Sequence, residues 1–107
     1  MSDRPDNASA WQEVWDVVRQ IPAGSVMSYG QVASLLHRRL SPRAVGWALN
    51  ACPDDVPWQR VVNVRGGCST DRLPGAEPGR QRRLLEAEGV EFDGRGRVRM
   101  ERHRWEP

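Results

Sequence analysis

Hydrophobic residues recur at the spacing of an α-helix near the start of the chain. They lie at positions i, i+3, i+4, i+7 and i+10 of one stripe: Trp11, Val14, Trp15, Val18 and Ile21. Such a stripe is one face of an amphipathic helix. Pro22 and Gly24 follow it and stop a helix. The pattern therefore predicts a helix from about Ser9 to Ile21, with Trp11 and Trp15 facing the core.

Two shorter helices are predicted next, from residues that favour helix N-termini. Ser28, with Gln31 three positions later, forms a capping-box pattern and predicts a helix that fades near Arg38. Ser41-Pro42 pairs an N-cap residue with proline at the first helical position, and predicts a third helix that ends before Pro53. Two short helices joined by a tight turn are typical of a helix-turn-helix.

Beyond Pro53 the sequence predicts both strands and a helix. The valine-rich run 61–64 predicts a short strand, and Arg80–Glu88 predicts a helix that the following glycine closes. Val90–Phe92 and Val98–Met100 flank a Gly-rich turn and predict a hairpin or wing. The expected fold class is α+β, mainly α, with a winged helix-turn-helix arrangement.

Length and composition limit the class of protein. With 107 residues, 38% of them hydrophobic, the chain supports one hydrophobic core. We expect a flexible N-terminus over residues 1–8 and a single domain over residues 9–107. No apolar run approaches the ~18 residues of a membrane span, and the polar start offers no secretory leader. A cytoplasmic monomer with no membrane partner is therefore expected.

Charge is distributed unevenly along the chain. All 16 basic residues are arginine, and against 14 acids they give a net charge of +2. Residues 1–36 carry 2 arginines against 4 acids, a net −2, whereas residues 37–107 carry 14 against 10, a net +4. Arginine suits phosphate and stacking better than lysine does, so the basic part favours a polyanionic partner. Codon bias in a GC-rich genome is an equally good explanation for the absence of lysine.

Metal and cofactor chemistry finds little support in the sequence. His37, Cys52, Cys68 and His103 are spaced too irregularly for a metal site. No glycine-rich phosphate-binding pattern is present, and the two cysteines allow at most one disulfide. We therefore expect no cofactor and no metal.

A series of ordered motifs points to one family. Within a matching stretch of roughly residues 9–92, most of the chain, they occur in the order Ile21-Pro22-Ala23-Gly24, Ser28-Tyr29-Gly30-Gln31-Val32-Ala33, Arg43-Ala44-Val45-Gly46, Pro57-Trp58-Gln59-Arg60-Val61-Val62 and Leu84-Leu85-Glu86-Ala87-Glu88-Gly89-Val90. Together they resemble the C-terminal DNA-binding domain of the O6-alkylguanine-DNA alkyltransferases.

The sequence departs from that family at the position that carries the chemistry. The alkyltransferases have Pro-Cys-His-Arg, in which the cysteine accepts the alkyl group and a histidine activates it. Here Trp58 stands at the acceptor position and Gln59 at the base position. An indole cannot replace the thiolate, and a carboxamide is not a useful base near neutral pH. The pattern instead resembles the alkyltransferase-like proteins, which bind alkylated guanine without repairing it and mark it for nucleotide-excision repair.

The resemblance also implies roles for individual residues. Arg43 matches an arginine finger that fills the base stack in the minor groove, and Tyr29 matches a tyrosine that helps rotate the nucleotide out. Trp58 would line the pocket, with its main-chain carbonyl and that of Val61 accepting from the guanine amine. Arg72 is the candidate to stack on the alkylated base.

Two sets of residues follow from the resemblance. The implied DNA-binding residues are Tyr29, Ser41, Arg43, Ala44 and Gly46. The implied lesion-pocket residues are Tyr29, Trp58, Gln59, Arg60, Val61, Arg72 and Glu88, with Glu88 bracing the network through Arg60 or Gln59. The expected partners are double-stranded DNA containing O6-alkylguanine and nucleotide-excision repair proteins, and the expected location is the cytoplasm, associated with the nucleoid.

Two alternatives remain open at this point. One is residual alkyl transfer to Cys52 or Cys68, which lie outside the acceptor motif. The other is a winged-helix regulator that reads undamaged DNA.

Overall fold

The first helix and its apolar stripe form one end of the molecule. The structure is a computed structural model that describes residues 4–37, 40–68 and 77–107. Helix α1 (Arg4–Arg19) begins before the predicted Ser9 and so includes residues 4–8. Pro5 is tolerated in the first turn of a helix. The stripe faces the core as predicted, because Val14 and Val18 are buried members of the larger hydrophobic cluster and Trp11 and Trp15 pack against it.

The predicted pair of short helices is present, with one boundary different. Helix α2 (Tyr29–Ser34) begins after Ser28, and both hydrogen bonds of the capping box are formed. It ends at Ser34 rather than near Arg38, because the chain tightens there into three-residue turns, such as Leu35 N–H to the Val32 carbonyl. Helix α3 (Pro42–Asn50) has the predicted N-cap and end.

Two very short strands join distant parts of the chain. Strand β1 (Met27–Ser28) pairs in parallel with β2 (Val61–Val62), with Met27 opposite Val61. The 3-10 helix η1 (Trp58–Arg60) leads into β2. The expected strand stops at Val62 and does not reach Val64, because the chain turns back through Gly66, whose φ of +88° suits glycine.

The remaining elements build a second, smaller core. Helix α4 (Arg80–Ala87) closes at Gly89 as predicted. The predicted hairpin is reduced to a single antiparallel bridge between Phe92 and Val98, since helix α5 (Met100–His103) begins directly after it. The buried members of this core come from four segments of the chain: Val26, Val62, Leu85, Val90 and Val98.

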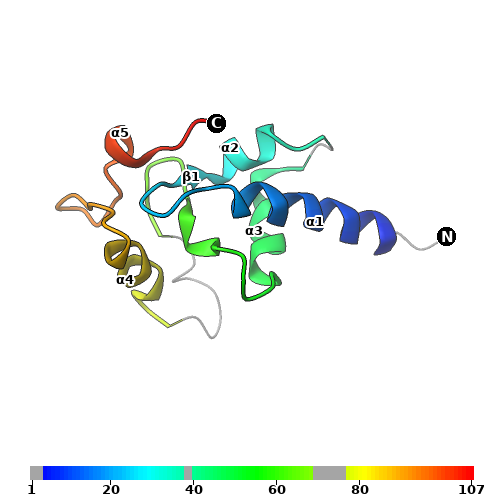
Figure 1. Cartoon of the computed structure of the whole chain (residues 1–107), viewed down its shortest axis with the longest axis horizontal. Coiled ribbons are helices and arrows are strands. Elements are labelled where there is room, and N and C mark those ends of the chain that lie inside the picture. The colour runs from blue at the N-terminus through cyan, green and yellow to red at the C-terminus, as the bar shows by residue number, and fades with distance from the viewer. Residues whose placement is uncertain (1–3, 38–39, 69–76) are drawn as a thin grey trace.

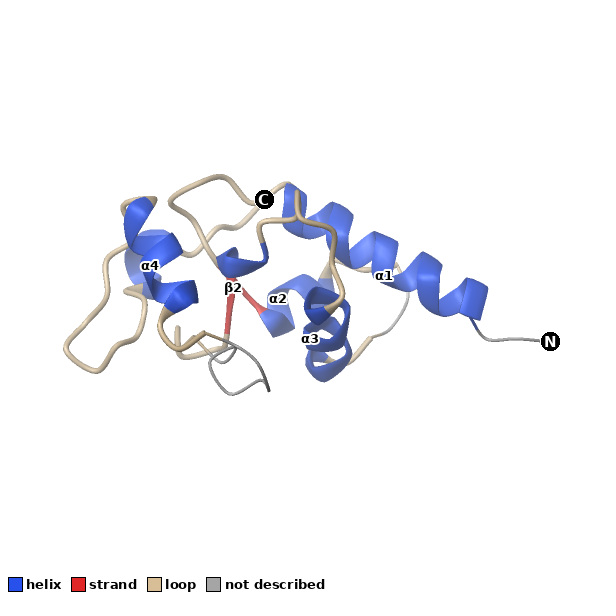
Figure 2. Cartoon of the chain, turned by 90° about the horizontal axis from the view of Figure 1, so that it is seen from below, coloured by secondary structure: helices blue, strands red, loops and turns tan. Residues whose placement is uncertain are grey.

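The helices therefore occupy two ends of an elongated molecule. Helices α1, α2 and α3 lie at one end and α4 and α5 at the other, with the short strands between them (Figures 1 and 2). The fold is mainly α with a small β element, as predicted. None of the described helices combines the length and apolar character that crossing a membrane requires.

Candidate nucleic-acid interface and lesion site

Tyr29 and the third helix are brought together at a glycine. Tyr29 is the first residue of α2, held in place by the Ser28 cap, and its ring is half-buried. A Cβ added to Gly46 on α3 would lie 3.8 Å from Cε1 of Tyr29. The Tyr29 ring therefore lies beside α3, at an ordinary van der Waals distance from the position that a Cβ would take. Two of the residues implied for DNA binding are neighbours in the fold.

The start of α3 presents an exposed arginine. Ser41 caps the helix by accepting a hydrogen bond from the Ala44 amide at 3.1 Å. Arg43 lies in the first turn, which contains no acid, and is exposed to solvent. Its guanidinium carbon is 5.8 Å from the ring centre of Trp47, itself 59% exposed. The surface of α3 therefore carries a positive charge beside a solvent-exposed aromatic ring.

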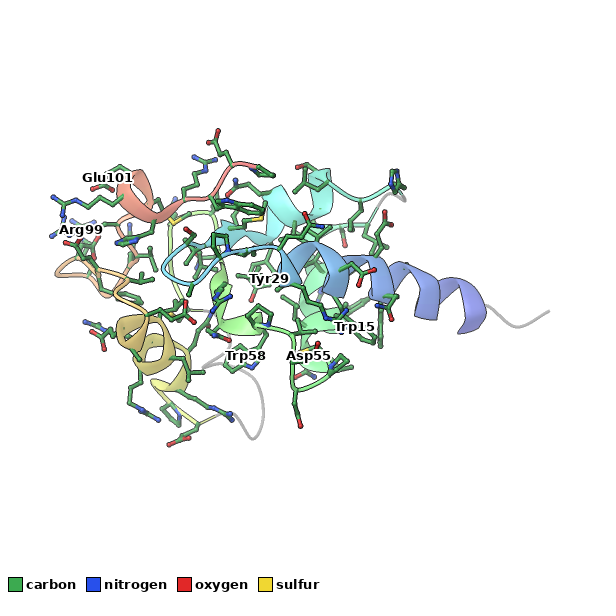
Figure 3. The ribbon with its side chains drawn as sticks, viewed as in Figure 1. Trp15, Tyr29, Asp55, Trp58, Arg99 and Glu101 are labelled. Carbon is green, nitrogen blue, oxygen red and sulfur yellow. The ribbon has the colours of Figure 1, made fainter. Side chains whose placement is uncertain are left out.

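Trp58 lies between the two ends of the molecule (Figure 3). It begins η1, is partly buried and packs against the larger core cluster. Figure 3 shows Trp58 and Tyr29 in this central part, whereas Arg99 and Glu101 lie at the end that carries α5. Sequence reasoning did not single out Arg80, whose guanidinium carbon is 5.8 Å from the Trp58 ring centre. No local signal identifies this contact, because it depends on how α4 docks beside η1.

Glu88 connects the two residues that follow Trp58 to the turn at Gly24. One carboxylate oxygen accepts from Gln59 Nε2 at 2.8 Å, and the other accepts from Arg60 Nε at 3.0 Å. The Gly24 amide also donates to Glu88, at 3.1 Å. Arg60 donates in addition to the Ile21 carbonyl at 2.8 Å. The two routes considered for Glu88, through Arg60 and through Gln59, are both present in the fold.

The environment of Glu88 keeps it ionised. Burial by itself would raise the pKa of this carboxyl, but the hydrogen bonds from Arg60, the Gly24 amide and Gln59, together with the charge of Arg60, outweigh it. The net effect lowers the pKa of Glu88 below its ordinary value. Gln59 is therefore a neutral donor fixed to a carboxylate.

A buried glutamine fixes the main chain around the motif. Gln81 on α4 is fully buried, and its Nε2 donates to the carbonyls of Gln59 at 3.1 Å and Val61 at 2.8 Å. The Trp58 carbonyl accepts from the Val61 amide. A carbonyl oxygen has two lone pairs and can accept from two donors. The expected contact of the Trp58 and Val61 carbonyls with a guanine amine stays a prediction.

The remaining sequence candidates are Arg72, Cys52 and Cys68. Arg72 lies outside the described residues. Cys52 and Cys68 form no disulfide within the described part of the chain. Burial, with the nearby Asp54 and Asp55, raises the pKa of the Cys52 thiol. Among the residues that the structure describes, no three histidine, cysteine or acidic side chains form a group that could hold a metal ion.

Comparisons with known proteins place this geometry in context. Residues 9–90 match the family model described as the 6-O-methylguanine DNA methyltransferase DNA-binding domain. A DNA base-flipping protein of Escherichia coli K12 is 43% identical over 96 residues, covering 88% of this chain and 72% of that protein. Alkyltransferase-like protein 1 of Schizosaccharomyces pombe is 34% identical over 103 residues, covering 91% and 94% respectively. Further relatives are named methylated-DNA–protein-cysteine methyltransferases.

A solved structure resembles this chain in both fold and sequence. The crystal structure of S. pombe Atl1, in complex with damaged DNA containing O6-carboxymethylguanine, superposes with a TM-score of 0.79 and 33% sequence identity. The match covers 94% of this chain and 97% of that one.

Proposed function

Because the chain belongs to the family of the 6-O-methylguanine DNA methyltransferase DNA-binding domain, we propose that it senses alkylated guanine in DNA without repairing it. The protein recognises damage by binding DNA, as its similarity to a base-flipping protein and to a damaged-DNA complex supports. One observation carries the non-enzymatic part of the proposal. Trp58 stands where the family has its acceptor cysteine, inside a Gln59–Glu88–Arg60 network that is fully formed.

The chemistry of alkyl transfer lacks both of its partners at this site. A transfer reaction needs a thiolate and a base that generates it. Trp58 offers no thiol, and the Gln59 amide donates to Glu88, so it has no basic nitrogen to accept a proton. Cys52 is a poor substitute, because its raised thiol pKa favours the neutral, unreactive form. Recognition without transfer is the function that this arrangement supports best.

The recognition step uses the exposed face of α3 and the central tryptophan. Extruding a base costs a few kcal/mol, and less at a weakened pair, so an alkylated guanine is easier to extrude than a normal one. Arg43 then takes the place of the extruded base in the stack, since a guanidinium plane stacks on bases while its charge stays near phosphates. Tyr29 assists the rotation, and the base stacks on Trp58 with Arg72 at the mouth of the site.

In this proposal, other proteins remove the adduct after it has been bound. A sensor that leaves the adduct in place needs a repair system that removes it, and we infer that the protein acts as a monomer, associated with the nucleoid, and presents the bound lesion to nucleotide-excision repair proteins. A strain without nucleotide-excision repair should then gain no protection from the protein against an alkylating agent. Protection that persists in that strain would contradict this part of the proposal.

Binding and mass measurements on one pair of duplexes test the proposal. The duplexes differ only by a single O6-methylguanine and are titrated at the same salt concentration, because phosphate contacts make DNA affinity salt-dependent. We expect tighter binding to the lesion duplex, an unchanged protein mass and an intact adduct. A protein that gains a methyl group is a transferase. Equal affinity for the two duplexes indicates a regulator of undamaged DNA.

A variant with a charge-matched control tests the recognition face. Arg43→Ala should weaken lesion binding by about 1–3 kcal/mol, on the order of a stacked and phosphate-contacting arginine. Arg99→Ala removes the same charge at the far end of the molecule (Figure 3) and should leave discrimination between the two duplexes unchanged. If discrimination survives Arg43→Ala, the role assigned to this arginine is wrong.

A further inference from the structure

Trp47 is an exposed aromatic residue that the recognition scheme above does not use. It is 59% exposed, whereas Trp15, on the helix that packs against α3, is partly buried and donates from its indole nitrogen to the Ala48 carbonyl at 2.8 Å. Leu35 and Val64 are the other large hydrophobic residues found exposed within the described part of the chain. Trp47 alone among these three lies on α3, one helical turn after Arg43.

The geometry of a helix explains why these two side chains meet. Residues four positions apart lie on the same face, and side chains on a helix lean toward its N-terminus. The Trp47 indole therefore covers the turn from which Arg43 projects. The 5.8 Å separation between the Arg43 guanidinium carbon and the Trp47 ring centre is within the range of a cation–π contact.

We propose that Trp47 is a positioning residue, which holds the Arg43 guanidinium against the exposed face of α3 before DNA arrives. An exposed arginine has many rotamers, and binding must otherwise select one of them. Arg43 makes no salt bridge with any acid of the described residues, and no acid stands in the first turn of α3. The indole holds the cation without neutralising its charge, which a carboxylate in the same place would do.

This proposal rests on the role of Arg43 in the proposed function, and the expected effect of Trp47 on DNA affinity is small. A cation–π contact at an exposed site corresponds to about a two- to fivefold change in affinity. Because Trp47 is mostly exposed, its replacement is not expected to unfold the protein. A loss of DNA binding can then be separated from a loss of structure.

A double-mutant cycle tests the proposal with the lesion duplex as ligand. Trp47→Leu should weaken binding about two- to fivefold, and Trp47→Phe, which keeps an aromatic face, should retain most of the affinity. In the Arg43→Ala background, Trp47→Leu should have no further effect. Val64→Ala, which trims another exposed apolar side chain, is the control and should change nothing. An equal loss in both backgrounds, or no loss in either, overturns the proposal.

A measurement without DNA separates this proposal from the proposed function. In the free protein, the indole ring current should shift the side-chain proton resonances of Arg43 upfield, and Trp47→Leu should remove that shift. If the shift is present but the protein binds both duplexes equally, the sensor function fails while the positioning contact stands. If the shift is absent, the positioning role fails whatever the duplexes show.

Discussion

Replacing Glu88 by glutamine should weaken the contacts that join it to Gly24, Gln59 and Arg60, and so destabilise the fold. The Glu88 carboxylate accepts from Gln59, Arg60 and the Gly24 amide, and the side chains of Glu88 and Arg60 are 14% and 18% exposed. Glutamine keeps one acceptor oxygen but loses the charge that faces Arg60. Hydrogen bonds to charged groups contribute about 1.5–3 kcal/mol each, and breaking a fully buried pair costs about 3–5 kcal/mol. For this partly exposed network we expect a loss of about 2–3 kcal/mol.

Urea unfolding of Glu88→Gln measures this loss, with Glu86→Gln, two residues earlier in the last turn of α4, as a matched control. Glu86 pairs with Arg82 four positions earlier, but both side chains are nearly half exposed, at 49% and 44%. Exposed pairs of this kind contribute about 0.3–0.5 kcal/mol. The control variant should therefore remain close to the original protein. Equal effects of the two substitutions would refute the reasoning.

The pH dependence gives a second test of the same prediction. The pKa of Glu88 is lowered by folding, so the unfolded chain binds the proton more readily. The stabilisation is therefore fully present above the ordinary carboxyl pKa of 4.5 and is lost as pH falls through the lower, folded pKa. The difference in unfolding free energy between the original protein and Glu88→Gln should be constant near pH 7 and shrink in acid. A difference that does not shrink would mean that the carboxylate charge is not its source.

Three further substitutions probe the surroundings of the site. Gln81→Leu should destabilise the protein by about 2–3 kcal/mol in urea unfolding, because it leaves two buried main-chain carbonyls without their donor. Gly46→Ala should raise the melting temperature, because alanine favours a helix by about 0.5–1 kcal/mol and its methyl meets only an ordinary contact at 3.8 Å. Arg80→Ala should weaken binding to the lesion duplex about two- to fivefold through the lost contact with Trp58, whereas Arg83→Ala, which removes the same charge from α4, should not.

The features that could be predicted from sequence are those that neighbouring residues decide. The capping box at Ser28 and the N-cap at Ser41 form as expected, because each depends on atoms within three or four residues. Gly89 closes α4 for the same reason, since its positive φ is a local requirement. The places where the prediction was wrong, such as the end of α2, are boundaries where local preferences are weak.

The unpredicted features depend on segments that are far apart in the sequence. Strand β2 falls within the predicted run 61–64, but its pairing with β1 was not predicted, because the two residues of β1 are too few for an alternating pattern to identify a strand. Helix α5 has four residues, and its position is fixed by hydrogen bonds between Val26 and the chain at His103 and Trp105. Gln81 and Arg80 carry no motif of their own, and only the docking of α4 against η1 brings them to Trp58.

The bracing of the motif is consistent with the proposed loss of alkyl-transfer chemistry. Glu88 and Gln81 both bind the η1–β2 segment, but in different ways. Glu88 accepts hydrogen bonds from side chains of the segment, whereas Gln81 donates to its main-chain carbonyls. Neither contact requires a cysteine at position 58 or a histidine at position 59. The glutamine amide donates to Glu88 as a histidine ring nitrogen also can, so the network survives the replacement. The framework around Trp58 is therefore formed in this chain, and the proposed stacking of a base on the indole would use it.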